Sequence, residues 1–402
     1  VARWRVDFFM RNPLLIWCDS LKPPQSKIAP RVRPSPEKGG WRERARRVAG
    51  LALLSALLTG CTSAGYYAQA VNGHLSLMAA ARPVSEVIAD PQTSDALRQR
   101  LAQSQDIRRF AVNELLLPDN ASYHRYADLH RPSAVWSVVA APPDALVAKT
   151  WCYPVIGCAS YRGYFSEAEA RAEAQALQAE GLEVIVQGVP AYSTLGWLNW
   201  AGGDPLLSTF INYPEGELAR LVFHELSHQL IYVRDDSSFN EAFATAVERL
   251  GGRRWLALHG SAAAREADAA LEARRQAFRG LVRQTRGELA AIFEKKSADP
   301  SMDRSYLAMK TEVMAGFRAR YAALRAGWGG DPAAYRRLDA WVSGANNASF
   351  VSQATYDELV PGFMRLFERE GGDTPQGWRR FYDAVNQLAG LSREERRRAL
   401  KE

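Results

Sequence analysis

Residues 221–244 read LVFHELSHQLIYVRDDSSFNEAFA, and this stretch decides the fold because it predicts two helices joined by a short turn. His224 and His228 stand four residues apart, a little more than one helical turn, so both imidazoles leave the same face of the first helix. Glu225 stands beside the first histidine, where it can take a proton from a metal-bound water. The turn at residues 235–238 (DDSS) is rich in helix-capping residues and predicts the start of the second helix.

Two antiparallel helices joined in this way would return Glu241 to the face that bears the two histidines. Two imidazoles and one carboxylate are typical of catalytic zinc sites, which keep a fourth position for water. Glu248 lies seven residues further along the same helix face, and it is either the rival third ligand or a residue that orients a ligand histidine. We favour Glu241 because it lies nearest the start of the helix. The sequence therefore predicts a Zn²⁺ site formed by His224, His228 and Glu241, with Glu225 as general base.

The segments around this motif predict an α+β fold that is mostly helical. Residues 134–140 and 182–189 have the composition of strands, and residues 166–180 between them predict a helix capped by Ser166. Beyond residue 252 nearly every segment has helical periodicity. We expect a small mixed sheet lobe packed on the HExxH helix, followed by a helical C-terminal lobe. The chain after the leader would then consist of an N-terminal α+β lobe (61–205), a zinc-binding helix pair (206–252) and the C-terminal lobe (253–402).

The first 60 residues predict a leader rather than part of the folded body. They contain twelve Lys and Arg against four Asp and Glu, a net charge of +8, whereas the whole chain carries +7 and the remaining 342 residues therefore sum to −1. A body so close to neutral gives no electrostatic reason to expect nucleic-acid binding.

The end of this leader has the order of a secretory signal. The basic residues 42–47 (RERARR) precede a short apolar run at residues 48–58, and Leu58-Thr59-Gly60-Cys61 follows. The alternative is a signal or core helix that happens to end in cysteine. Residues 1–31 fit no signal sequence, so we expect the translation start to lie further in, near Val32.

Two further cysteines, Cys152 and Cys158, lie six residues apart in WCYPVIGC. In an oxidising compartment such a pair predicts a disulfide that closes a small loop, and free thiols are the alternative.

Several of these segments resemble known families. His224–His228 followed by Asn240-Glu241-Ala242-Phe243-Ala244 resembles the HExxH…NExxA pattern of gluzincin peptidases. More closely, the chain resembles a family of predicted aminopeptidases found as lipoproteins in Gram-negative bacteria; the shared segments, which cover most of the chain after Cys61, are SYHRYADL, WCYPVIGCASYRGYF, AYSTLGW, DPLLST, FHELSHQL and FNEAFATAVE. The resemblance implies a zinc peptidase with the site residues named above. Leu58–Cys61 resembles a lipobox, which implies a lipid anchor at Cys61, in the outer membrane and facing the periplasm.

We therefore expect a zinc metallopeptidase that cleaves a peptide or protein substrate. Such a reaction needs a donor to the tetrahedral oxyanion, and Tyr356 is a candidate on residue type alone. One alternative is a catalytically silent zinc-binding lipoprotein that serves as scaffold or chaperone partner. Another is a hydrolase for a different envelope amide, such as a peptidoglycan stem peptide. The presence of Glu225 argues against the silent scaffold, because a structural zinc site needs no base beside its ligand.

Overall fold

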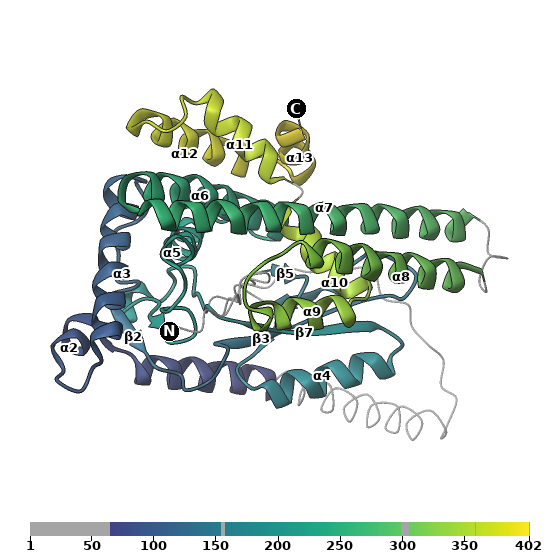
Figure 1. Ribbon diagram of the computed structural model, residues 1–402, viewed down its shortest axis with the longest axis horizontal. Helices are drawn as coiled ribbons and strands as arrows, with labels where there is room; N and C mark the ends of the chain where they lie inside the picture. Colours follow the sequence, from purple (N-terminus) through teal and green to yellow (C-terminus); the bar gives the residue numbers. More distant parts are fainter. Residues whose placement is uncertain (1–64, 154–156, 299–304, 358, 402) are drawn as a thin grey trace, which may run out of the picture.

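In the part of the chain that the structure describes, most residues are helical, and the strands form two small three-stranded sheets and one hairpin (Figure 1). The computed structural model describes residues 65–153, 157–298, 305–357 and 359–401, without the side chains of residues 354–357. Residues 65–80 are helical, and the elements that follow in chain order are β1 (Arg82–Pro83), α2 (Val84–Ala89), α3 (Asp95–Asn113), β2 (Arg125–Ala127), β3 (Val135–Ala141), β4 (Trp151–Tyr153), β5 (Gly157–Ala159), β6 (Arg162–Tyr164), α4 (Glu167–Ala179), β7 (Glu183–Val189), β8 (Leu206–Leu207), α5 (Glu215–Leu230), α6 (Ser237–His259), α7 (Ala262–Ala298), α8 (Ser305–Ala326), α9 (Arg336–Ser343), α10 (Asn347–Asp357), α11 (Val360–Arg369), α12 (Pro375–Ala389) and α13 (Arg393–Lys401). The expected α+β fold, mostly helical with small sheets and a helical C-terminal part, is confirmed.

The larger sheet has the strand order β6-β3-β7 and is antiparallel throughout. Its register pairs Val135 with Val189 at one end and Ala141 with Glu183 at the other. Helix α4 covers one face of β3 and β7, and α10 covers the other face (Figure 1). Because both faces are covered, all seven residues of β3 are buried, and the strand is apolar apart from Ser137.

Helices α5 and α6 form the antiparallel hairpin expected around the HExxH motif, and they pack closely against each other. Leu221, Val222 and Phe223 of α5 are fully buried, so the motif lies on a helix enclosed by the core. Gly251 permits the close approach of α6, since a Cβ at this position would lie 2.9 Å from a ring carbon of Phe223. Helix α10 packs on α6 as well as on the sheet, and therefore connects the sheet to the helix pair.

The last three helices, α11 to α13, lie on the side of α6 that faces away from the large sheet (Figure 1). Phe243 of α6 contacts Phe363 of α11 and Phe381 of α12, with ring centroids 5.8 and 6.1 Å apart. Arg396 of α13 donates from Nε and Nη2 to Oδ2 of Asp236, at 3.0 and 2.8 Å. Asp236 also accepts the backbone N–H of Phe239, so the C-terminal helix holds the residue that caps α6.

The long helices α7 and α8 pack on each other and share a second apolar cluster with α9. No helix within the described ranges combines the length and the apolar character needed to cross a bilayer.

We expect Arg396→Ala to lower the free energy of unfolding by about 3–5 kcal/mol, because it leaves a buried carboxylate without its closest cation. Asp236 has 2% of its side chain exposed. The matched control is Arg393→Ala, which removes a side chain that is 58% exposed and 3.8 Å from Asp236, and it should cost less than about 1 kcal/mol. Urea titration of both variants measures the difference, and equal losses would contradict this account of the cap.

Candidate metal centre

The two histidines of the motif converge on one point inside the protein. His224 and His228 are buried on the same face of α5, and their Nε2 atoms lie 3.2 Å apart. Glu241 of α6 brings one carboxylate oxygen to 3.5 Å from Nε2 of His224 and to 3.8 Å from Nε2 of His228. Donors that bind one zinc ion tetrahedrally at about 2.1 Å lie about 3.4 Å from each other. The three side chains could therefore hold one metal ion.

Glu248 lies on the opposite side of the His224 ring. Its Oε2 is 2.9 Å from Nδ1 of His224, whereas the converging donors face Nε2. A carboxylate in this position fixes the orientation of the ring and its tautomer, as in many metal sites. Of the two roles that the sequence left open for Glu248, this geometry favours the orienting one.

The charges of the site favour a cation. Burial by itself would lower the pKa of His224, but hydrogen bonds to Glu241 and Glu248 outweigh burial and raise the pKa to about 10. Burial and the charge of His224 together lower the pKa of His228 well below its usual range. Burial raises the pKa of Glu241, against the effect of its contact with His224. The carboxylates of Glu241 and Glu248 thus stabilise a positive charge on His224, and the same negative charges would favour a metal cation beside it.

The turn between the helices is held by two side chains that precede Glu241 in the sequence. Asn240 accepts the N–H of Val233 at 2.8 Å and donates to its carbonyl oxygen at 2.7 Å. Asp235 accepts the N–H of Cys158 at 2.8 Å, so the turn is also bound to the β4–β5 hairpin. That hairpin contains the Cys152–Cys158 disulfide that the cysteine spacing predicts. A Cβ at Gly157 would lie 1.8 Å from Asp235, which explains why glycine occupies this position.

Two tyrosines near the ligands were not found from the sequence. The pKa of Tyr161 is raised well above its usual range by burial and then by the charges of Glu241 and Glu225. Burial and the charge of Glu241 raise the pKa of Tyr232 to about 12. No pattern in the sequence points to Tyr161, because it lies far from the motif in the chain and shows no ligand spacing. Both phenols are therefore candidate donors beside the metal centre.

Two residues predicted for the site fall outside the described part of the structure. The side chain of Tyr356 is one, although its backbone belongs to α10. Cys61, the expected anchor, lies in residues 1–64, which are also outside the described ranges, together with the rest of the leader.

A buried carboxylate supports the end of α5 next to the metal ligands. Asp204 accepts the N–H and the hydroxyl of Thr194 at 3.0 and 2.8 Å and the hydroxyl of Ser193 at 3.1 Å. It also accepts from Nε2 of Gln229, the residue after His228, at 3.3 Å. Burial raises the pKa of Asp204 to about 6, although the hydrogen bonds from Thr194 and Ser193 act in the opposite direction. The loop before α5 is thus bound to the end of the ligand helix.

Because the pKa of Asp204 is raised in the folded protein, we expect this residue to make the free energy of unfolding depend on pH. Between its ordinary pKa of about 4 and its folded pKa of about 6, the unfolded state loses the proton first, so the free energy of unfolding falls as the pH rises. The loss should be on the order of 2–3 kcal/mol and nearly complete by about pH 7, one unit above the folded pKa. In Asp204→Asn this component should disappear, whereas the exposed control Asp383→Asn should keep it. Urea titrations from pH 4 to 7 measure it, and an identical pH profile for Asp204→Asn and the unsubstituted protein would contradict the assignment.

Comparison with known proteins assigns the chain to a family. A family model described as "Putative aminopeptidase" matches residues 65–400, which is most of the chain and includes the α5–α6 hairpin. No curated protein and no solved structure matches the chain.

Proposed function

Because the chain belongs to this aminopeptidase family, we propose that it is a zinc-dependent peptidase in which His224, His228 and Glu241 hold the ion. The observation that carries the proposal is the convergence of three buried donor atoms within 4.8 Å of one another. Two imidazole nitrogens and a carboxylate oxygen are the donor set of catalytic zinc sites, and they leave a coordination position open. The family description supports peptide substrates and removal of residues from the amino terminus.

The chemistry divides between the ion and the residues around it. Zinc, when bound, lowers the pKa of a water molecule towards neutrality and polarises the scissile carbonyl group. Glu225 is buried on α5 directly beside His224, and we assign it the general-base role: it accepts the proton of the water and delivers it to the leaving amine. Glu248 keeps the Nε2 atom of His224 directed at the ion by holding Nδ1.

A hydroxyl donor is needed for the oxyanion of the tetrahedral intermediate. Tyr161 and Tyr232 are better supported for this role than Tyr356, because the pKa values of both respond to the charge of Glu241. Tyr161 is buried and also interacts with the charge of Glu225, so we assign the role to Tyr161 first.

We expect Glu225→Gln to lower kcat/KM on peptide substrates by about 10²–10⁴-fold while about one zinc remains bound per chain, because the amide keeps the shape of the carboxylate but accepts no proton. Metal analysis and a panel of peptides with free and with acetylated amino termini measure both quantities. The exposed control Glu266→Gln should keep full activity.

Four outcomes would redirect this proposal. Stoichiometric zinc with no cleavage of any panel member would favour the catalytically silent scaffold, and activity that survives complete removal of metal would contradict the zinc mechanism. Equal cleavage of free and acetylated peptides would contradict trimming from the amino terminus. Cleavage restricted to peptidoglycan stem peptides would favour the envelope amidase.

We also propose that Cys61 is the lipid-bearing residue of an outer-membrane lipoprotein that faces the periplasm. The support is the order of basic residues, apolar run and Leu58-Thr59-Gly60-Cys61 in the sequence. A single acyl chain holds a protein only weakly, so stable anchoring requires more than one chain on this cysteine.

In a Gram-negative host, Cys61→Ala should abolish incorporation of labelled palmitate and release the protein from the membrane fraction. The neighbouring variant Thr62→Ala should keep both the label and the membrane location. Retention of the label by Cys61→Ala would contradict the anchor.

A further inference from the structure

The Cys152–Cys158 disulfide lies at the surface, beside the turn that joins the two ligand helices. It links β4 to β5 at the middle pair of their hairpin, where the two cysteines stand directly opposite each other. Both cysteines are exposed, whereas Gly157 and Ala159 on either side of Cys158 are buried. A reductant in solution can therefore reach this disulfide while the rest of β5 stays in contact with the protein.

Strand β5 binds the turn between α5 and α6. The N–H of Cys158 donates to Oδ1 of Asp235 at 2.8 Å. Asp235 has a φ of 64°, in the left-handed region that few residues other than glycine adopt, so this contact helps to hold an unfavourable backbone conformation. The next residue, Asp236, caps α6, the helix that carries Glu241. The hydrogen bond from β5 therefore supports the start of a helix that supplies a metal ligand.

Strand β4 anchors the hairpin in a different part of the protein. Trp151 and Tyr153 pack against an apolar cluster that includes Tyr66 and Tyr164. The ring centroids of Tyr153 and Tyr66 lie 5.9 Å apart. Among the described elements, neither β4 nor β5 packs broadly on a helix or on another strand. The disulfide thus joins the strand that is anchored in the cluster to the strand that binds the turn.

The chain beyond β5 enters the metal centre. Tyr161, three residues after Cys158, is buried. Burial raises the pKa of Tyr161, and the charges of Glu241 and Glu225 raise it further, so the phenol lies near both carboxylates. A displacement of β5 would therefore move Tyr161 as well as the turn.

A hairpin of this size depends on its cross-link. The two strands have three residues each, and a two-stranded hairpin alone is only marginally stable in water. Without the disulfide we expect β5 to separate from β4 for part of the time, and Asp235 then loses the N–H of Cys158. A displacement of about 1 Å at a catalytic group is enough to lower a reaction rate about 10²-fold.

We propose that the Cys152–Cys158 disulfide is a thiol–disulfide exchange site at which a dithiol protein lowers the activity of the metal centre. One thiolate of the dithiol attacks a sulfur of the disulfide and forms a mixed disulfide, which the second thiol of the dithiol then resolves. Two electrons and two protons pass to the chain, which gains two cysteine thiols, and the dithiol becomes a disulfide. Oxidation by a disulfide protein reverses the exchange. The effect on activity rests on the proposed peptidase function.

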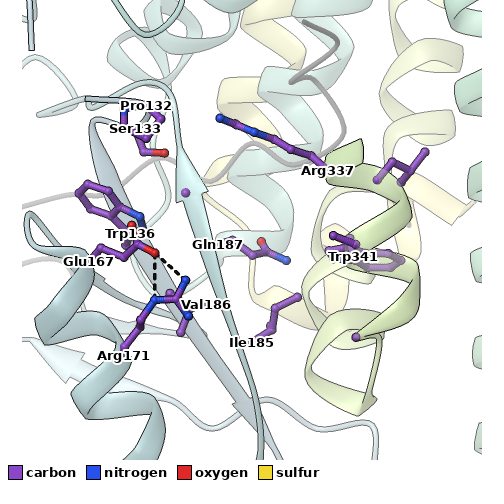
Figure 2. A pocket seen from close by; sticks show the side chains of 14 residues that line it. Pro132, Ser133, Trp136, Glu167, Arg171, Ile185, Val186, Gln187, Arg337 and Trp341 are labelled. Atoms are coloured by element: carbon purple, nitrogen blue, oxygen red, sulfur yellow. Dashed lines mark hydrogen bonds and ion pairs between the residues drawn. The ribbon is translucent and has the colours of Figure 1, made fainter. Parts of the chain in front are cut away.

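A groove of about 580 Å³ between β7 and α9 lies outside these contacts and provides an internal control (Figure 2). Its lining residues come from β3 and the segment before it, α4, β7 and α9 with the glycine that ends it, and none belongs to β4, β5, α5 or α6. Figure 2 shows the ion pair of α4 at this groove, with 2.9 Å between Arg171 Nε and Glu167 Oε1. Loss of the disulfide should leave this region unchanged.

Hydrogen exchange followed by mass spectrometry, on the full zinc-loaded chain, tests the loosening without any need for activity. The double variant Cys152→Ser/Cys158→Ser represents the reduced state and avoids thiol reductants, which bind zinc. Amide exchange at residues 231–236 and in β5 should become about tenfold faster, whereas β7 should keep its protection. If the double variant fails to fold, the same comparison is made on the unsubstituted protein reduced with a phosphine. Unchanged exchange in the turn would overturn the proposal.

Peptidase activity measures the consequence for the site. In the double variant kcat should fall about tenfold or more while about one zinc stays bound per chain. Asp235→Ala removes the acceptor of the Cys158 N–H and should cause a similar loss with the disulfide intact. The matched control Asp235→Asn keeps an acceptor oxygen and tolerates a positive φ, so it should keep full activity. Full activity of Asp235→Ala would overturn the proposed coupling.

The exchange itself is measured on the folded protein with an excess of dithiothreitol. Alkylation should then label Cys152 and Cys158, and oxidised glutathione with added zinc should restore both the disulfide and the activity. Resistance of the disulfide to this excess would contradict the exchange site. An equal loss of activity in the double variant under dithiothreitol would assign the effect to zinc removal and overturn the proposal. If the oxidised protein cleaves no peptide, the proposed function fails, whereas hydrogen exchange still decides whether the disulfide holds the turn.

Discussion

The structure depends on the burial of three titratable side chains at one point between two helices. His224, His228 and Glu241 are almost fully buried, and their donor atoms lie 3.2 to 3.8 Å apart. Such a group costs stability unless a positive charge lies among its members, because burial disfavours isolated polar groups. Burial disfavours the charged form of His224, but hydrogen bonds to Glu241 and Glu248 outweigh it and raise the pKa to about 10, so these surroundings favour a positive charge. A divalent ion would satisfy all three donors at once, so the fold of the hairpin and the binding of metal are expected to be coupled.

The hairpin is held in place by polar contacts from distant parts of the chain. The disulfide-bonded β4–β5 hairpin binds the turn through Asp235, and the C-terminal helix α13 binds the cap residue Asp236. Asp204 binds Gln229 at the end of α5, and α10 packs between α6 and the large sheet. Precise placement of ligands requires such support, because a displacement of about 1 Å is enough to lose a productive geometry. The elements around the helix pair therefore serve the site even where they contribute no ligand.

Much of the site could be predicted from the sequence because the residues that form it lie close together in the chain. The spacing of His224 and His228 fixes their common helix face, and the capping residues before Glu241 predict the return of the second helix. Tyr161 and Asp204 could not be predicted, because each depends on contacts between segments far apart in the chain that carry no spacing pattern. The role of Glu248 could be predicted only in part. Helical periodicity places it on the same face as Glu241, but only the structure shows that its carboxylate contacts Nδ1 of His224. The lobe boundaries and the lipid anchor stay predictions.

The central claim is that one zinc ion lies between α5 and α6, bound by two imidazoles and one carboxylate. Diffraction data collected on both sides of the zinc absorption edge, from crystals of the zinc-loaded protein, test it most directly. The account predicts a single strong anomalous peak about 2.0–2.2 Å from Nε2 of His224, Nε2 of His228 and the Glu241 carboxylate, with Glu248 still bound to Nδ1 of His224. A peak bound by Glu248 in place of Glu241, or no peak between the two histidines, would contradict it.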